Sequence, residues 1–430
     1  MRKFLYSVLM LAAVVLAACS NDDNGDTQPK RGMTLNASVE NLSSRATMTD
    51  ESGTWKFAFT QNDKVSVSNN KITSYYTFTN NGSQFTSTDA MVTTEDADWY
   101  AYFPGDKVDL TNQTGTFADV ANKFAVAGKT ALTTTGEKGL SITLKSKVAV
   151  LRVVAVDKNG ILDIHVKTAD GKWVKGLTAT KNAAEFTVST SDTKTTLLHR
   201  AAGEVKPGDI NYVVVPAGVK IAIYNGDLLL NTTKTGLTEG KYYTITSGPT
   251  KGTTNALIKG VETPIKWVQL WAGGPRFATE NVTEEMTWTE AAKTGKEYVW
   301  GENWRTPTAE EVEEEGGLWF DWSTGQAKAG SPTFTITTAP DGTEETVVFT
   351  GVQPGYTKNT LTLYKKVVNG YNQFDFWTST NDGGYGCKFI IWRKDNMTWG
   401  FGISKRHDPN TEYHLVRPVL SIENITNNPK

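Results

Sequence analysis

The sequence VAVLRVVAV, at residues 148–156, is apolar except for Arg152. A short apolar run that is rich in valine is typical of a β-strand buried on both faces. A second run of this kind, YVVVP, occupies residues 212–216. These two runs predict a fold that is built on buried β-strands.

The sequence around these runs supports the same interpretation. Apolar and polar residues alternate in KVSVS at residues 64–68 and in EFTVS at residues 185–189, as expected for strands with one buried face. Turn sequences separate the strands, including NNG at residues 80–82 and NGD at residues 225–227. Many short strands at such spacing are typical of β-sandwiches, and a break near residues 136–146 predicts two of them in tandem, at residues 31–140 and 141–247.

The distribution of tryptophan marks a third domain. Only Trp55, Trp99 and Trp173, of thirteen tryptophans in the chain, precede residue 250. The glycine-, proline- and threonine-rich sequence SGPTKGTT, at residues 247–254, separates the two regions and is typical of a linker. We therefore expect a separate domain at residues 255–430.

The N-terminus has the features of an export signal. The basic sequence MRK is followed by an apolar segment at residues 4–18, too short for a membrane-spanning helix, and then by Cys19. The sequence LAAC at residues 16–19 resembles the signal of bacterial lipoproteins, which implies that residues 1–18 are removed and that Cys19 is lipidated. The alternative is an ordinary secreted protein in which this cysteine occurs by chance.

The polar sequence after Cys19 predicts a flexible tether at residues 19–30. Its sequence NDD, at residues 21–23, resembles the acidic export signal of surface lipoproteins in anaerobic bacteria with an outer membrane. This resemblance implies a surface-exposed protein of the outer membrane. The alternative is a plain solvated linker.

Composition narrows the possible functions. The formal net charge is −2, so no basic excess indicates a nucleic-acid partner. Cys387 is the only cysteine besides Cys19, and it lies in the apolar sequence CKFIIW. With Cys19 committed to lipid, no intramolecular disulfide is expected, and we interpret Cys387 as a small buried hydrophobic residue.

Residues 31–247 resemble the fimbrillin family of lipoprotein pilins from the outer membrane. The resemblance rests on five motifs in order along the chain: QNDKVSV at 61–67, WYAYFP at 99–104, KSKVAVLRVV at 145–154, YVVVP at 212–216 and LTEGKYYTI at 237–245. Gln61 and Asn62 depart from the family pattern, in which a tryptophan and a glycine are more typical. The resemblance implies two tandem transthyretin-like β-sandwiches.

The resemblance also implies a mode of assembly. In such pilins a protease cuts after an arginine and releases the first strand, and a strand from the neighbouring subunit fills the groove that is left. Arg45, followed by Ala46, is the corresponding cleavage site here. The released strand would be residues 34–39, with Leu35, Ala37 and Val39 on one face. The alternative is that Arg45 is a linker residue and that the strand is permanent.

The C-terminal region mixes short helices with strands. Thr287 and Glu290 have the spacing of a helix capping box, and RTPTAEEV at residues 305–312 predicts a second helix that ends at Gly316. Strands are predicted at residues 333–337, 346–349, 360–363, 374–380, 388–394, 399–404 and 416–420.

This region resembles the "major paralogous" domain of bacterial surface proteins, which has a C-type-lectin-like fold. The matching motifs are NWRTPTAEE at 303–311, FWTST at 376–380 and HLVRPV at 414–419, and the sequence departs from the family in an insertion at residues 324–370. The resemblance implies an α+β domain at residues 255–430.

The tryptophans of this domain fall into two groups. Trp304 and Trp377 lie inside the motifs and are expected in the core. Trp319, Trp322, Trp392 and Trp399 lie outside the motifs and are candidate contacts to a glycan or to a protein of a host or bacterial surface, although packing in the core is an equally good interpretation. Arg305 and Glu310 are expected to form internal polar contacts.

Features of an enzyme are not found in the sequence. The four histidines, His165, His199, His407 and His414, lie in no metal-ligand spacing. The sequence HDPN at residues 407–410 is first a turn signal, and the carboxylates at residues 310–315 are typical of a solvated helix face. We expect no catalytic residue, no metal and no cofactor.

Together these features predict a fimbrial subunit on the cell surface. A whole domain stands where a pilin would carry its donor strand, which favours a tip or accessory adhesin that binds other fimbrial subunits by β-strand addition. The alternative is a free-standing outer-membrane lipoprotein that binds glycans or proteins and is not part of a pilus.

Overall fold

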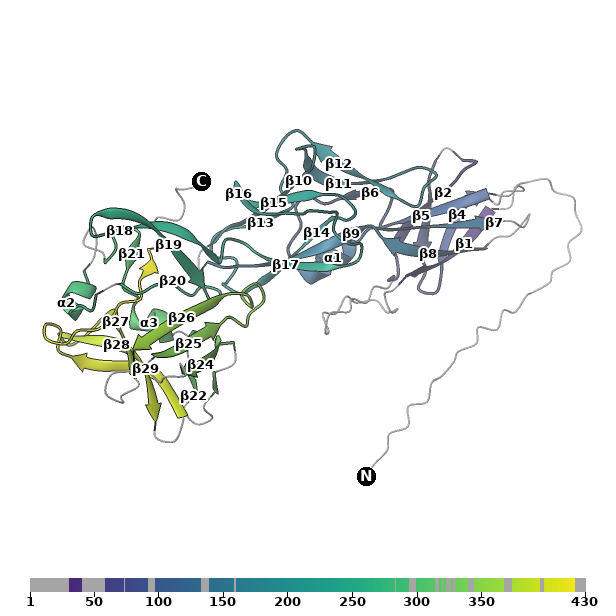
Figure 1. The fold of residues 1–430 in the computed structure, drawn as a ribbon. Helices are drawn as coiled ribbons and strands as arrows, with labels where there is room; N and C mark the ends of the chain where they lie inside the picture. Colours follow the sequence, from purple (N-terminus) through teal and green to yellow (C-terminus); the bar gives the residue numbers. More distant parts are fainter. Residues whose placement is uncertain are drawn as a thin grey trace, which may run out of the picture.

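The computed structural model describes two segments of the chain, residues 31–40 and 59–421. Short stretches inside the second segment are excluded, at residues 73, 92–96, 133–138, 158–159, 283, 294–298, 314–316, 319, 322–325, 328–329, 339–343, 367–372 and 395–397. The described chain is mainly β, as predicted, and its strands follow one another in three units (Figure 1). No helix within these residues is long and apolar enough to cross a membrane.

The first unit is a closed barrel with the strand order β1-β4-β3-β2-β5-β7-β8. Its strands are β1 (Arg31–Val39), β2 (Lys64–Asn69), β3 (Tyr76–Asn80), β4 (Phe85–Met91), β5 (Ala97–Phe103), β7 (Val126–Leu132) and β8 (Gly139–Ser146). In β8 the residues alternate between exposed and buried, and Leu140, Ile142 and Leu144 face the core. This alternation lets β8 line the barrel interior, as each strand of a small barrel must.

The barrel corrects two sequence predictions. The first unit was expected to be a sandwich, but β1 pairs with both β4 and β8 and thereby closes the sheet. The unit was also expected to end at residue 140, but β8 continues to Ser146 within the same sheet. The boundary at 140/141 was misplaced because β8 and the next strand are separated by a single residue, Lys147.

The second unit has two sheets. One contains β12 (Phe186–Ser191), β11 (Trp173–Ala179), β10 (Leu162–Thr168), β15 (Ile221–Asn225) and β16 (Leu228–Thr232), with β13 (Leu198–Arg200) and β6 (Lys107–Asp109) attached. The other has the order β14-β9-β17, from β14 (Ile210–Pro216), β9 (Val148–Val154) and β17 (Tyr242–Thr246). The two apolar runs of the sequence are therefore paired neighbours.

The first two units share one hydrophobic core. A single cluster of buried side chains extends from Met33 of the barrel to Leu237 of the second unit. The short helix α1 (Phe117–Lys123) lies in sequence between β6 and the barrel strand β7, and it begins at the N-cap Thr116. Strand β6 follows the barrel strand β5 in the chain but pairs with β11, so the two units are also joined by hydrogen bonds.

The third unit begins earlier than predicted. Strand β18 (Lys251–Ile258) pairs along its whole length with β19 (Val261–Gln269), although residues 247–254 were expected to be a linker. Glycine and threonine dominate this stretch, but cross-strand pairing with β19 overrides their turn character. A five-stranded sheet continues with β20 (Arg276–Ala278), β30 (Val419–Leu420) and β21 (Trp304–Arg305).

The remaining strands of this unit form small antiparallel sheets. They are β22 (Phe320–Asp321) with β23 (Gln326–Ala327); β24 (Thr333–Thr338), β25 (Glu344–Thr350) and β26 (Thr360–Lys366); and β27 (Gln373–Asp382), β28 (Tyr385–Lys394) and β29 (Thr398–His407). The strands β24 to β29, between residues 333 and 407, all lie where the sequence predicted a strand.

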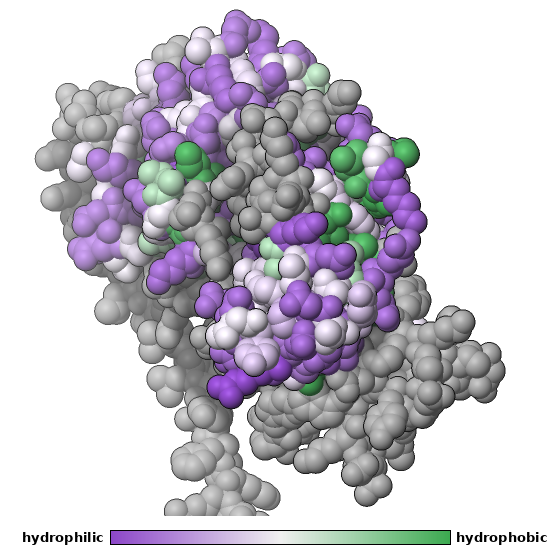
Figure 2. Space-filling view, turned by 90° about the vertical axis from the view of Figure 1, so that its left-hand side faces the viewer, coloured by the Kyte–Doolittle hydropathy of each residue, from purple (hydrophilic) through white to green (hydrophobic). Residues whose placement is uncertain are grey.

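Both predicted helices of the third unit are present. Helix α2 (Trp288–Ala291) begins at Thr287 with the predicted capping box to Glu290. Helix α3 (Ala309–Glu313) begins just after Pro307, within the sequence that predicted a helix. On the face shown in Figure 2, the described residues at this end of the molecule are mostly hydrophilic, with small and separate hydrophobic patches.

Candidate functional site

Strand β1 is the first candidate functional element. It pairs with β8 in parallel from Thr34 to Val39 and with β4 in the antiparallel sense, as Leu35 does with Phe85. Met33 and Leu35 are fully buried, and Ala37 and Val39 pack against the same core. The predicted inward face of Leu35, Ala37 and Val39 is confirmed.

The position of β1 gives it a specific role in the barrel. Because it is bonded on both sides, its removal would leave β4 and β8 as two facing, unpaired edges over an apolar groove. Unpaired edges of this kind readily accept another strand. Arg45, Ala46 and Cys19, the predicted processing and lipidation residues, lie outside the described residues.

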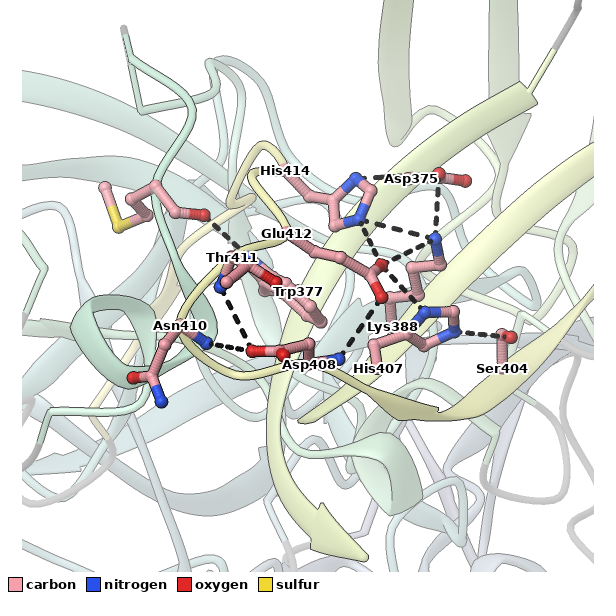
Figure 3. Close-up of polar contacts among 11 residues, drawn as sticks. Asp375, Trp377, Lys388, Ser404, His407, Asp408, Asn410, Thr411, Glu412 and His414 are labelled. Carbon is pink, nitrogen blue, oxygen red and sulfur yellow. Dashed lines mark hydrogen bonds and ion pairs between the residues drawn. The ribbon is translucent and has the colours of Figure 1, made fainter. Parts of the chain in front are cut away.

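A cluster of charged side chains in the third unit is the second candidate. Figure 3 shows Lys388 of β28 among acidic groups and histidines from β27, β29 and the segment after β29. The Lys388 Nζ lies 3.2 Å from the Asp375 Oδ2, 3.7 Å from the Glu412 Oε2 and 3.3 Å from the His414 Nε2. Only 7% of Lys388 is exposed, so these neighbours supply most of its polar contacts.

Glu412 connects the two histidines of the cluster. Its Oε2 lies 2.9 Å from the His407 Nδ1 and 3.3 Å from the His414 Nε2. The His407 Nε2 forms a second hydrogen bond, of 2.7 Å, with the hydroxyl of Ser404 (Figure 3). The cluster therefore ties the end of β29 to the segment that leads into the last strand.

The loop between His407 and Glu412 is a turn, as the sequence HDPN predicted. The Asp408 carboxylate accepts hydrogen bonds from the backbone N–H groups of Asn410 and Thr411, at 2.9 and 3.1 Å. The Glu412 Oε1 in turn accepts one from the Asp408 N–H, at 3.2 Å. These local bonds hold Glu412 in place to meet both histidines.

Two groups of the cluster have shifted pKa values. Burial opposes ionisation of Glu412, but hydrogen bonds from His414, the Asp408 N–H and His407 outweigh it and lower the pKa of the carboxyl. Burial, and then the charge of Lys388, lower the pKa of His414 below its ordinary value of 6.5. The folded cluster therefore favours an ionised Glu412 and a neutral His414.

The geometry of the cluster fits a structural role. The charged groups are occupied with one another, and the Trp377 ring covers His414 at 4.7 Å between ring centroids. No group of three or more His, Cys, Asp or Glu side chains that could hold a metal ion is present among the described residues. The cluster joins residues 375, 388, 407, 412 and 414, and only the close pair Glu412 and His414 could have been noticed in the sequence.

Several smaller predictions are settled by the structure. Trp304 and Trp377 are fully buried, as expected, and Cys387 is a free buried thiol whose pKa is raised by burial. Arg305 makes an internal polar contact, as expected, with Glu311, which also accepts a hydrogen bond from the Thr308 N–H. Glu310, which was expected to make such a contact too, is exposed.

The four tryptophans proposed as ligand contacts stay predictions. Trp319 and Trp322 lie outside the described residues. The backbones of Trp392 and Trp399 lie in β28 and β29, in the pairs Trp392–Gly400 and Arg393–Trp399. The rings of these two residues are not among the described side chains.

Comparisons with known proteins give structural likenesses only. No family model matches the chain, and no curated protein matches it. A candidate cell adhesion protein from Bacteroides ovatus is similar over 56% of this chain and 96% of its own, with 10% identity and a TM-score of 0.32.

Two further solved structures also resemble this chain at low sequence identity. A candidate cell adhesion protein from Bacteroides uniformis matches over 55% of this chain and 97% of its own, with 11% identity and a TM-score of 0.31. A fimbrial protein from Bacteroides ovatus matches over 92% of this chain and all of its own, with 11% identity and a TM-score of 0.24. Likenesses at such identities and TM-scores do not establish a function.

Proposed function

We propose that the protein is a fimbrial subunit of the cell surface, of the tip or accessory type, that is assembled by donor-strand exchange after cleavage between Arg45 and Ala46. The observation that carries the proposal is the position of β1. This strand closes the barrel between β4 and β8 and buries Met33 and Leu35, yet it lies at the N-terminal end of the unit, ahead of the proposed cut.

Cleavage at Arg45 would separate β1 from the rest of the barrel. The strand would then be held only by its hydrogen bonds and buried side chains, and a strand from a neighbouring subunit could replace it. Such a strand would pair with β4 and β8 and place apolar side chains in the sites of Met33 and Leu35. Backbone hydrogen bonds would supply affinity, and the alternating side chains would supply specificity.

The remaining parts of the proposal come from the sequence. Lipidation of Cys19 would hold the protein in the outer membrane, exposed at the surface, until it is assembled. The third unit would be a C-type-lectin-like binding domain without enzymatic activity, directed at a glycan or at a surface protein. The second unit, with its two sheets, is the part that fits a transthyretin-like sandwich.

A second candidate function rests on the same N-terminus. If β1 is permanent, its extensive pairing would simply complete the barrel, and the protein would be a free-standing outer-membrane lipoprotein that binds glycans or proteins. The two functions differ in whether the chain is cut at Arg45 and whether it enters filaments.

The variant Arg45→Ala tests the proposal in cells. It should remain uncut, keep β1 and stay in the membrane fraction, whereas the wild type and a Ser43→Ala control should appear in sheared filaments. Entry of Arg45→Ala into filaments at the wild-type level would contradict strand exchange at this site.

A further inference from the structure

A basic groove in the third unit is not used by any function described so far. It has a volume of about 330 Å³ and lies over the sheet of β18, β19 and β20, with residues 358–360 along one side. A volume of this size is within the usual range for binding sites of small ligands. Its lining includes three lysines and three threonines: Lys251, Lys266, Lys358, Thr253, Thr279 and Thr360.

The strand register places most of these side chains on one face. Thr253 is paired with Lys266, and Lys251 lies two residues before Thr253 on β18. Cross-strand partners share a face, and residues two apart on a strand share it too. The backbone N–H of Thr279 also bonds to the Lys266 carbonyl, at 2.9 Å, which extends the arrangement to the end of β20.

The third lysine is held beside this face by its neighbour Asn359. The Asn359 side chain is 3% exposed, and its amide donates to the backbone carbonyl of Gln269 at 2.8 Å and to that of Thr250 at 3.4 Å. These bonds fix residues 358–360 against the start of β18 and the end of β19. Lys358 is therefore positioned by the fold at the groove.

The charge of the groove is not neutralised from within the described part of the chain. Lys251, Lys266 and Lys358 are all exposed, and none of their ammonium groups has an ion pair or a hydrogen bond with another described residue. Other lysines of the same unit do have acidic partners, as Lys259 has Glu284 at 2.7 Å. Among the residues that the structure describes, no carboxylate lines the groove.

We propose that this groove binds an acidic oligosaccharide, a glycan that carries carboxylate or sulfate groups. Three ammonium groups from three segments of the chain match several anionic groups on an extended ligand, and the hydroxyls of Thr253 and Thr360 match sugar hydroxyls. The described lining has no arginine and none of its residues forms a helix N-terminus, so the groove lacks the usual features of a tight site for a single phosphate. The ligand is that of the binding domain proposed above, and to that extent this inference rests on the proposed function.

The test is direct binding by the full-length protein in neutral detergent. The probes are a sulfated hexasaccharide, a polyuronate hexasaccharide, a neutral hexasaccharide, inorganic phosphate and a polyglutamate peptide of similar charge. Titration calorimetry should show binding of at least one acidic oligosaccharide that weakens as salt is raised, and little binding of the neutral one.

Charge variants locate the site. The triple variant K251Q/K266Q/K358Q should bind the acidic oligosaccharide about tenfold more weakly or worse, since three favourable charges are lost. The triple variant K206Q/K220Q/K234Q makes the same change in net charge at exposed lysines outside the groove and should bind as the wild type does. Replacement of the three groove lysines by arginine should retain binding.

Each other result would overturn the proposal. Equal binding by K251Q/K266Q/K358Q and the wild type would exclude the groove, provided that both unfold at the same temperature. Phosphate or polyglutamate bound as tightly as the acidic oligosaccharides would contradict a glycan ligand, and so would binding of none of them. Because cleavage at Arg45 and entry into filaments are not measured here, failure of this inference is distinguishable from failure of the assembly proposal.

Discussion

Leu35 of β1 lies opposite Leu140 of β8 across a parallel strand pair, and the two residues are only 0% and 2% exposed. On its other side Leu35 is paired with Phe85 of β4, which is 3% exposed. Leu35 thus contributes to both strand pairs, β1 with β4 and β1 with β8, that close the barrel. Assembly by strand exchange depends on how firmly this strand is held.

The substitution Leu35→Ala should loosen β1. It removes a fully buried side chain, which typically lowers the free energy of unfolding by about 2–5 kcal/mol. Amide hydrogen exchange of the peptide that covers residues 31–40 should become much faster. The exposed neighbour Asn36 provides the control, and Asn36→Ala should change the exchange little.

Leu35→Ala should also speed cleavage at Arg45, if opening of the barrel limits access of the protease. A time course of proteolysis at pH 7 would show this. Faster exchange of β1 without faster cleavage would mean that the protease does not need β1 to open.

The stability of the third unit should fall as the pH is lowered. The pKa of His414 is lowered in the fold, so below its ordinary value of 6.5 the unfolded chain binds a proton that the folded chain does not. The pKa of Glu412 is also lowered, so below its ordinary value of 4.5 the same sign applies. Both groups therefore make stability rise with pH and decline in acid.

The two contributions can be separated with His414→Gln. This variant should lose the part of the decline that begins near pH 6.5 and keep a smaller part that begins near pH 4.5, because the Asp408 N–H and His407 still bond to Glu412. Thermal unfolding of the full chain across pH 3 to 8 is the measurement. An unchanged pH profile in His414→Gln would show that this histidine is not responsible.

The contact between Arg305 and Glu311 should stabilise the start of α3. Arg305 donates through Nη1 to the Glu311 Oε2 at 2.7 Å, and both side chains are about a quarter exposed. Glu311→Ala would leave a partly buried guanidinium without this partner, at a cost of about 1–3 kcal/mol. Glu310→Ala removes an exposed carboxylate of the same helix and should cost about 0.5 kcal/mol or less. Chemical unfolding of the two variants gives the comparison, and equal losses would contradict the assignment.

Local sequence patterns predicted the structural features that depend on residues close together in the sequence. The alternation at Leu35, Ala37 and Val39 gave the inward face of β1, and Thr287 with Glu290 gave the start of α2. The strands from residue 333 onward follow from the alternation of β-branched and polar residues.

Contacts between distant parts of the chain could not be predicted in this way. Closure of the barrel depends on pairing of β1 with β8, about a hundred residues later, and no local pattern specifies that partner. The cluster around Lys388 joins five side chains from three strands and a loop, and the basic groove joins β18 and β19 to residues 358–360. Such sites become visible only when the topology is known.

The most direct test of strand exchange is mass spectrometry of the protein's N-terminus, in sheared surface filaments and in outer membranes. Strand exchange predicts a filament form that begins at Ala46 and a membrane form that begins at acylated Cys19. A protein found only in membranes, with every molecule beginning at Cys19, would contradict strand exchange and leave the free-standing binding lipoprotein as the better function.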